Sequence, residues 1–502
     1  MKKPSRIFLL MMAVLMLCSC TYNMTLTPSS DVTSSIQDGK SSELYPPEQP
    51  AFNESLPVQS DGGEPSSDAQ SSELSEDTSS KAGDTQSSSK VSSSASSSSK
   101  AASSKPTSSA GSSSKAPSSQ ETSSAAQPSQ NTAAPADELR AVWISYLDLE
   151  TMLKSKSQSA AKSAINKAFD NVTDRAMNAV ILQVRPFADA LYESDYFPWS
   201  RILTGTQGKD PGYDPLELMV ASARARGLEV HVWINPYRIL TSTSYSNLAS
   251  GHIAREWNAQ GNDYTIVVDG KGIFFNPARK QVRDLIVDGV TEIVANYDID
   301  GIHFDDYFYP TTAASFDKTA YSEYKADGGG KSLSAWRMDN VNKLISETYS
   351  AVKSVDSSVQ FGVSPNGNID QNYSTLYADV KTWCKNEGYI DYIMPQLYYG
   401  FENATCPYEQ TLKAWNDMIT VKGIKLYPGL AVYKIGTEDQ WAGAGSQEWL
   451  STTTMLRRQV ASARAYSKYD GFALYRYDSA VNPASAVASR VAKEIDNLIS
   501  IL

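Results

Sequence analysis

Residue types that metal and disulfide chemistry require are scarce in this 502-residue chain. It has four cysteines and three histidines, and the histidines show no His-x-His or His-Glu-x-x-His spacing. A zinc hydrolase built from His231, His303 and Asp305 is therefore a weaker alternative, and we expect neither a metal nor another cofactor. No Gly-x-Gly-x-x-Gly or Walker-type loop follows a predicted strand, so nucleotide binding loses its main support.

Long basic runs and long apolar runs are also missing. The formal net charge is −11 and no extended basic stretch occurs, which argues against nucleic acid as a partner. Beyond the first twenty residues no eighteen consecutive residues are apolar, so we expect no transmembrane helix. An acidic surface suits a neutral or modified glycan better than it suits a polyanion.

The first twenty residues have the pattern of a bacterial lipoprotein signal. A basic start precedes the short apolar run 7–17, and Leu17-Cys18-Ser19-Cys20 resembles a lipobox. We therefore expect residues 1–19 to be a signal peptide and Cys20 to carry diacylglycerol. The protein would then be extracytoplasmic and anchored to the bacterial membrane by this lipid. An ordinary secretory signal is the alternative.

Serine dominates residues 20–136. Such a segment has too little apolar surface to offset the entropy lost on ordering, so we predict a disordered tether. Most apolar and aromatic residues follow it, and we predict one folded domain over residues 137–502. Its two cysteines, Cys384 and Cys406, are predicted to lie too far apart for a disulfide.

Periodicity after residue 137 predicts eight strand-then-helix units, which favours a (β/α)8 TIM barrel over an open doubly wound sheet. The predicted strands are 140–146, 179–185, 229–235, 301–305, 359–364, 392–398, 425–431 and 471–477. The predicted helices are 159–176, 215–226, 280–297, 336–355, 375–385, 408–420, 447–467 and 484–501.

Alternation along these strands predicts a polar and aromatic barrel interior. Successive side chains of a strand face opposite sides, so apolar residues such as Val180 and Leu182 face the helices. The residues predicted to face inward or to lie at the rim include Gln183, Arg185, His231, Trp233, Asn235, Asn366, Met394, Gln396, Tyr398, Tyr427, Tyr433, Tyr475, Tyr477 and Asp478. This mixture suits a glycan, because aromatic faces stack on sugar rings and polar groups bind hydroxyls.

Two adjacent carboxylates, Asp305 and Asp306, end the fourth predicted strand and are followed by Tyr307, Phe308 and Tyr309. Active sites of (β/α)8 barrels lie at the carboxyl ends of the strands. A single Asp at a strand end is more often a cap or turn residue. Two in succession beside aromatic residues favour a functional site.

Several stretches resemble the glycosyl-hydrolase-like family ten of bacterial lipoproteins, also described as YngK-like. They are Gln183-Val-Arg-Pro-Phe-Ala-Asp-Ala190, Tyr196-Phe-Pro-Trp-Ser200, Pro211-Gly-Tyr-Asp-Pro215, Trp233-Ile-Asn-Pro-Tyr-Arg238, Gly301-Ile-His-Phe-Asp-Asp-Tyr-Phe-Tyr-Pro310, Val363-Ser-Pro-Asn-Gly367 and Asp391-Tyr-Ile-Met-Pro-Gln-Leu-Tyr398. The resemblance implies a (β/α)8 glycosidase fold and cleavage of peptidoglycan glycan strands that lack stem peptides. Tyr399 is a departure, because the pattern usually has Trp there.

Alternation and these motifs together predict Asp305 and Asp306 as catalytic residues. The predicted substrate-binding residues are Arg185, Asp189, Trp233, Asn235, Tyr237, Arg238, His303, Tyr307, Asn366, Gln396, Tyr398, Tyr399 and Asp478.

Two catalytic schemes fit the pair. Ordinary glycosidases use two carboxylates about 5–5.5 Å or about 6.5–9.5 Å apart, and the partner of Asp305 would then be Asp189, Asp306, Glu402 or Asp478. Alternatively, the pair resembles the neighbouring aspartates of hexosaminidases that remove O-linked N-acetylglucosamine. In those enzymes the 2-acetamido oxygen of the substrate attacks the anomeric carbon, one carboxylate orients the amide and the other protonates the leaving oxygen.

Adjacency favours substrate assistance, in which Asp305 and Asp306 share the two roles in an order left open. Tyr398 could hydrogen-bond the oxazolinium that forms. The predicted function is a cell-surface glycoside hydrolase that cleaves glycans containing 2-acetamido sugars, most simply peptidoglycan. The alternative is a non-catalytic glycan-binding lipoprotein that keeps the cleft of a glycosidase-like barrel.

Overall fold

The computed structural model describes residues 137–502. The predicted signal peptide, Cys20 and the serine-rich tether lie outside the described residues. The central sheet has nine strands, and all of its strand pairs are parallel. They are β1 (Leu139–Ile144), β2 (Ala179–Arg185), β3 (Glu229–Ile234), β7 (Gly301–Phe304), β8 (Gln360–Val363), β9 (Tyr392–Ile393), β10 (Lys425–Leu426), β11 (Gly429–Ala431) and β12 (Gly471–Tyr475).

The sheet closes on itself through the seventh predicted strand. Its order is β10-β9-β8-β7-β3-β2-β1-β12-β11, and the two end strands, β10 and β11, are separated by Tyr427 and Pro428 alone. Tyr427 N donates to Ile393 O at 3.0 Å and Gly429 N to Pro395 O at 2.9 Å, while β11 pairs with β12 on its other side. Counting β10 and β11 as one strand gives the predicted eight-stranded barrel.

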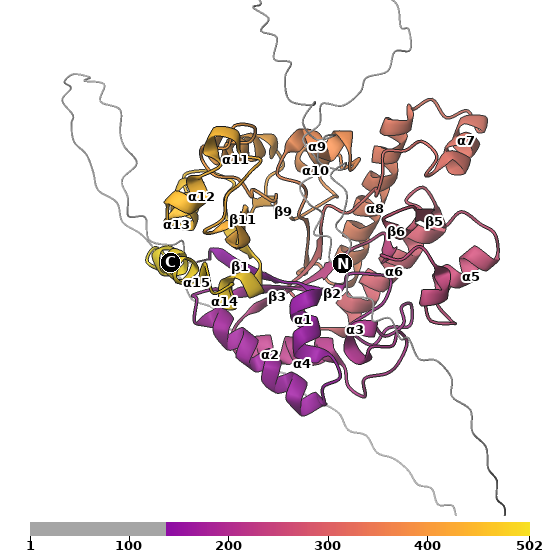
Figure 1. The fold of residues 1–502 in the computed structure, drawn as a ribbon. Coiled ribbons are helices and arrows are strands. Elements are labelled where there is room, and N and C mark those ends of the chain that lie inside the picture. Colours follow the sequence, from indigo (N-terminus) through magenta and orange to yellow (C-terminus); the bar gives the residue numbers. More distant parts are fainter. Residues whose placement is uncertain (1–136) are drawn as a thin grey trace, which may run out of the picture. The chain divides into compact units, whose positions relative to one another are not determined.

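Helices surround this barrel (Figure 1). The bounds are α1 (Tyr146–Leu153), α2 (Gln158–Thr173), α3 (Arg201–Thr204), α4 (Pro215–Arg224), α5 (Ile253–Ala259), α6 (Lys280–Asn296), α7 (Lys318–Ala326), α8 (Leu333–Val355), α9 (Ile369–Ser374), α10 (Val380–Lys385), α11 (Tyr408–Met418), α12 (Glu448–Ser451), α13 (Met455–Ala463), α14 (Tyr477–Val481) and α15 (Ala488–Ile499).

Each predicted helix has an observed counterpart, but several predicted elements start later, end earlier or are divided. The predicted helix 375–385 begins only at Val380, after the Asp379 side chain caps it. The predicted helix 447–467 is two helices, α12 and α13, with extended backbone at Thr452 between them. The eighth strand ends at Tyr475 and a short helix, α14, starts at Tyr477. Tyr477 therefore does not face into the barrel, as predicted, but packs in the layer between strands and helices.

Two apolar layers follow the predicted alternation. Outward-facing residues such as Val180, Leu182 and Val232 are fully buried against the helices. A separate cluster fills the barrel interior and consists of Leu139, Ala141, Trp143, Ala179, Ile181, Trp233, Tyr392, Met394, Tyr427 and Ala473. The interior is thus apolar and aromatic as well as polar.

An insertion between β3 and α6, which the sequence did not predict, lies outside the ring of helices (Figure 1). It contains the antiparallel sheet β4-β6-β5, with β4 (Arg238–Leu240), β5 (Thr265–Val268) and β6 (Gly272–Phe275), together with α5. Lys271 Nζ donates to Pro310 O at 2.9 Å. The insertion therefore contacts the loop that follows β7.

The loop after β7 is also held by Arg337, a residue of α8. Arg337 and Asp317 form an ion pair at 2.6 Å in which both side chains are fully buried. The Arg337 guanidinium also donates to Thr312 O at 3.1 Å and Ala313 O at 2.8 Å. A buried, multiply bonded Arg of this kind holds a loop in one conformation.

Two further expectations can be compared with the described residues. Cys384 and Cys406 are both free, as predicted. None of the helices between residues 137 and 502 is long and apolar enough to span a membrane.

Candidate active site

The carboxylate pair lies at the carboxyl end of β7, which runs between β3 and β8. Asp305 is 3% exposed, Asp306 is half-buried and Tyr307 is 42% exposed. Exposure therefore rises over these three residues, from the end of the barrel strand to the surface.

Asp305 accepts hydrogen bonds from three donors. Trp233 Nε1 donates to its Oδ2 at 3.0 Å, and Asn235 Nδ2 donates to the same oxygen in a short bond. The backbone N–H of Tyr307 donates to Oδ1 at 3.1 Å. Trp233 and Asn235 were predicted to bind substrate, and the structure shows that they hold Asp305.

Asn235 is itself held by a chain of hydrogen bonds. Its Oδ1 accepts from Gln183 Nε2 at 2.7 Å, and Gln183 Oε1 accepts from the backbone N–H of Tyr146 at 2.9 Å. Gln183 and Asn235 are 3% and 2% exposed. These bonds connect the ends of the first three barrel strands to Asp305.

The two carboxyls titrate at unusually high pH. Burial and, secondarily, the charge of Asp306 raise the pKa of Asp305 to about 8. Burial raises the pKa of Asp306 to about 6, although a hydrogen bond from Gln396 opposes this shift. Because adjacent carboxyls titrate as a coupled pair, the pair holds one proton when the pH lies between these two pKa values.

Aromatic side chains lie beside the pair. The Tyr398 ring lies 5.8 Å from that of Tyr433 and 5.5 Å from that of Tyr475, centroid to centroid. The Arg238 guanidinium lies 5.9 Å from the centre of the Tyr307 ring, and its charge favours the ionised form of Asp305. Such a group of rings provides apolar faces on which sugar rings can stack.

His303 lies below the pair, in the barrel interior, and is fully buried. Its Nε2 accepts from Trp143 Nε1 at 3.2 Å, so its proton is on Nδ1, which lies 3.0 Å from the Tyr392 hydroxyl. That hydroxyl is also 3.0 Å from His231 Nδ1. Burial, and secondarily His231, hold the pKa of His303 well below its usual range. The prediction that His303 binds substrate is wrong, because its neutral ring is a core group.

Three other predicted substrate-binding residues are also buried. The register of β2 against β3 shifts between Gln183 and Arg185, so alternation fails there. Arg185 points outward, with its guanidinium 4.2 Å from the Phe197 ring and against Gly289 of α6. Tyr237 and Asp189 are both 0% exposed. None of the three hydrogen-bonds either carboxylate of the pair.

Three other predicted residues at the rim contact their own segments of the chain. Asn366 Oδ1 accepts from Asn368 N at 2.9 Å and so forms a turn after β8. The Tyr399 ring lies against Gly367 of the same loop. Asp478 stands in the first turn of α14, 3.7 Å from Arg476. Of the thirteen predicted substrate-binding residues, the structure places Trp233, Asn235, Arg238, Tyr307, Gln396 and Tyr398 around the carboxylate pair.

A second buried carboxyl at the rim was not predicted. Asp148 accepts from Ser145 N at 2.8 Å and from Arg476 Nη1 at 2.9 Å, which joins the ends of β1 and β12. Burial raises its pKa, while Arg476 and Ser145 oppose the shift. The pattern Ser145-x-x-Asp148 directly after the first strand is a capping-box signal that could have revealed α1 and this carboxyl.

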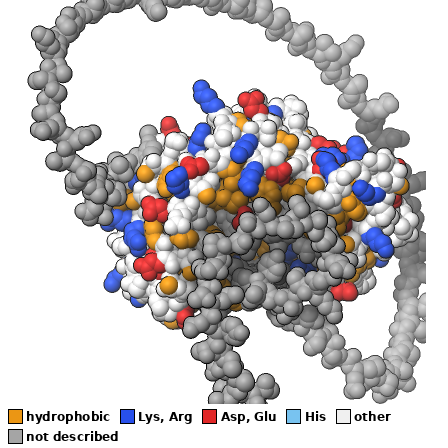
Figure 2. Space-filling model, turned by 90° about the horizontal axis from the view of Figure 1, so that it is seen from above, with side chains coloured by type: hydrophobic (Ala, Val, Ile, Leu, Met, Phe, Trp, Pro, Cys, Tyr) orange, Lys and Arg blue, Asp and Glu red, His pale blue; other side chains and the backbone are white. Residues whose placement is uncertain are grey.

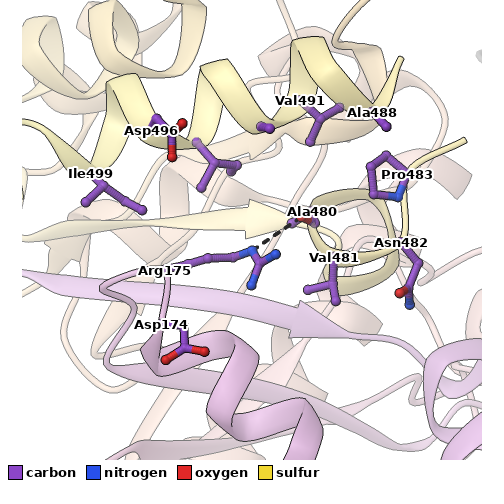
Figure 3. A pocket seen from close by; sticks show the side chains of 12 residues that line it. Asp174, Arg175, Ala480, Val481, Asn482, Pro483, Ala488, Val491, Asp496 and Ile499 are labelled. Atoms are coloured by element: carbon purple, nitrogen blue, oxygen red, sulfur yellow. Dashed lines mark hydrogen bonds between the residues drawn. The ribbon is translucent and has the colours of Figure 1, made fainter. Parts of the chain in front are cut away.

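Outside the barrel, an open groove of about 520 Å3 runs along α15. Arg175 lies in it and donates from Nε to Ala480 O at 3.3 Å (Figure 3). Its lining comes from the turn after α2, from α14 and from α15, and none of the predicted site residues takes part. The groove is therefore separate from the carboxylate pair.

The surface charge is mixed. On the described part of the face in Figure 2, acidic and basic side chains are interspersed and hydrophobic side chains gather between them. Within residues 137–502, no three His, Cys, Asp or Glu side chains are grouped so that they could hold a metal ion.

Comparison with known proteins identifies related sequences. The model of the family described as glycosyl hydrolase-like 10 matches residues 138–443. Glycosyl hydrolase YngK of Bacillus subtilis (strain 168) is 37% identical over 64% of this chain and 66% of its own length. Glycosyl hydrolase DigH of Escherichia coli (strain K12) is 32% identical over 66% of this chain and 79% of its own.

Among solved structures, the glycoside hydrolase domain of PgaB (BpsB) from Bordetella bronchiseptica aligns with 70% of this chain and 98% of its own. The identity is 13% and the TM-score 0.45, a likeness too weak to bear on function.

Replacing His303 with Phe should destabilise the barrel without a dependence on pH near neutrality. The substitution leaves the Trp143 N–H without its buried acceptor, at about 1–3 kcal/mol, and removes one of the two imidazole partners of the Tyr392 hydroxyl, which keeps His231. We expect the free energy of unfolding, measured with urea, to fall by about 2–4 kcal/mol. Tyr196→Phe, which removes an exposed hydroxyl, is the control. A His303→Phe protein as stable as the control would contradict the core role.

Proposed function

Because this chain belongs to the glycosyl hydrolase-like 10 family, we propose that it is a glycosidase acting through Asp305 and Asp306. The proposed substrate is a glycan with 2-acetamido sugars, most simply peptidoglycan. The observation that carries the proposal is the carboxyl pair itself. Two adjacent carboxyls at a barrel rim share one proton near neutral pH, which is the state that acid-assisted glycoside cleavage needs.

The electrostatics favour one division of roles. Asp305 is more deeply buried and has the higher pKa, about 8, so it holds the proton and acts as the general acid. Asp306, with a pKa of about 6, is ionised at neutral pH and accepts a hydrogen bond from the N–H of the substrate acetamide. The acetamide oxygen attacks the anomeric carbon as the glycosidic bond breaks. Asp305 protonates the leaving oxygen and later takes a proton from the water that opens the oxazolinium.

The positions of the other carboxyls support substrate assistance over a scheme with a separate nucleophile. Asp189 is fully buried and accepts from Gln207. Asp478 is in the first turn of α14, and Glu402 is exposed in the loop before α11. Asp306 is therefore the carboxyl that acts on Asp305 most directly, and the acetamide supplies the missing nucleophile.

The tyrosine rings beside the pair fit the same substrate. Tyr398, Tyr433 and Tyr475 offer apolar ring faces beside the acid, and Gln396 bonds the Asp306 carboxyl. Such ring faces suit the apolar faces of uncharged sugar rings.

We also propose that the protein works at the outer side of the membrane, bound through lipid on Cys20. The sequence pattern of residues 1–20 motivates this proposal, and the serine-rich tether would let the barrel reach glycan at a distance from the membrane.

Replacing Asp305 or Asp306 with Asn should lower kcat by about a hundredfold to ten-thousandfold. Wild-type activity should rise as the pH passes about 6, where Asp306 ionises, and fall as it passes about 8, where Asp305 loses its proton. In Asp306→Asn the neighbouring negative charge is gone, so the pKa of Asp305 falls. The basic limb of the residual activity should therefore move to lower pH. The measurement is the pH profile of kcat on an N-acetylhexosamine oligomer.

The matched control for both variants is Asp496→Asn, which changes a carboxyl of the outer groove and should leave kcat unchanged. Activity within tenfold of wild type in both site variants would remove the pair from the chemistry.

Substrate assistance predicts that the acetamido group is essential. We expect oligomers whose 2-acetamido groups have been removed to be cleaved at least about a hundredfold more slowly, because the nucleophile is then absent. Reducing ends and products would be measured by mass spectrometry, with peptidoglycan bearing and lacking stem peptides as parallel substrates. Equal cleavage of acetylated and deacetylated chains would rule out this mechanism. Binding without product from any substrate would favour the non-catalytic alternative.

Cys20→Ser should release the protein from membranes. Fractionation of cells that produce the wild type or the variant would measure this, with Cys406→Ser as the control because that free thiol lies in the folded domain, in the loop before α11. A Cys20→Ser protein that stays with the membrane would contradict anchoring by lipid.

A further inference from the structure

The hydrogen bonds that lead to Asp305 have a fixed direction. A backbone N–H can only donate, so Tyr146 N forces Gln183 to present Oε1 to it. Gln183 must then present Nε2 to Asn235, whose Oδ1 accepts at 2.7 Å. Asn235 is left with its NH2 group facing Asp305. One backbone donor therefore determines the orientation of two side-chain amides.

This direction makes the two oxygens of Asp305 unequal. Oδ2 accepts from both Asn235 Nδ2 and Trp233 Nε1, and two bonds use the two acceptor positions of a carboxyl oxygen. Oδ1 accepts only the N–H of Tyr307, at 3.1 Å, so it retains one position. A proton on Oδ1 leaves every donor around Asp305 satisfied.

We propose that Gln183 is a positioning residue that keeps the acid proton of Asp305 on Oδ1. This inference rests on the proposed role of Asp305 as the general acid. Without Gln183 the amide of Asn235 is free to turn and present its own oxygen to Asp305. The proton would then be held between Asp305 Oδ2 and Asn235 Oδ1, on the side away from Oδ1, and would not reach the glycosidic oxygen.

Gln183 is remote enough for this role to be tested separately from binding. It is buried, and its side chain bonds Tyr146 N and Asn235 Oδ1. We expect Gln183→Met to lower kcat by about tenfold to a hundredfold with KM within about threefold of wild type. The N–H of Asn235 stabilises ionised Asp305, so its loss raises the pKa of Asp305. The basic limb of the kcat profile should therefore move to higher pH.

If Gln183 had a purely structural role, Gln183→Met would lower the stability of the protein and leave both limbs of the pH profile of kcat in place. The matched control is Gln459→Met, since Gln459 is also a fully buried glutamine with one side-chain bond, to Tyr399 O at 2.9 Å. It should change neither kcat nor the pH limbs. A folded Gln183→Met protein with kcat within twofold of wild type, or with unmoved limbs, would overturn the proposal.

Gln183→Glu provides a conservative variant. When protonated, the new carboxyl can accept from Tyr146 N and donate to Asn235 Oδ1, so the direction of the chain is kept. When ionised, it attracts the NH2 group of Asn235 and reverses the chain. We expect activity within about threefold of wild type at the acidic end of the profile, falling below wild type as the new carboxyl ionises. A variant impaired equally at every pH would count against the proposal.

Neutron diffraction from crystals of the wild-type protein tests the proton position without any substrate. At a pH between the two pKa values of the pair, we expect a deuteron on Asp305 Oδ1. We also expect the deuterated amide nitrogen of Asn235 to face Asp305 Oδ2. A deuteron on Oδ2, or the Asn235 oxygen facing Asp305, would refute the inference. If the wild type cleaves no glycan while the deuteron lies on Oδ1, the proposed function fails and the positioning role of Gln183 stands.

Discussion

The seventh strand position carries the constraint on which the barrel depends. Residues 425–431 bond β9 on one side and β12 on the other, and without them the sheet would have two open edges. The interior leaves little room at this closure. A side chain at Gly429 would meet the Trp143 ring at 2.8 Å. Closure brings Trp143, near the start of the domain, within hydrogen-bonding distance of His303.

At the rim, burial and hydrogen bonding act on Asp305 in opposite directions. Burial favours the neutral carboxyl, and the donors Trp233, Asn235 and Tyr307 favour the charged one. The outcome is a carboxyl that changes its protonation state near neutral pH while its orientation stays fixed. A general acid requires both properties, because it must give up a proton and recover it without moving.

The sequence predicted the eight strand positions, the eight principal helices and the location of the carboxylate pair. Alternation succeeded where strands are regular, as at Val180 and Leu182. It failed at Arg185, because a register shift reverses the facing of the side chain. It also failed at Tyr477, because the strand ends two residues earlier.

Sequence periodicity does not predict how deep in the barrel a residue lies or how a loop folds. His303 and Asp305 share one face of β7, but alternation does not show that one is in the core and the other at the rim. Asp189 and Tyr237 lie in loops, where a period of two has no meaning. The insertion and the bond between Asp148 and Arg476 depend on chain segments meeting in space, which local periodicity does not report.

The insertion between β3 and α6 has a consequence for how such a protein can diversify. It meets the loop after β7 through Lys271, but its sheet shares no strand with the barrel. Mutations that lengthen, shorten or recharge it would change the surroundings of the loop after β7 and leave the barrel hydrogen bonds intact. Descendants of such a chain can therefore vary this segment while they inherit the same barrel and the same carboxylate pair.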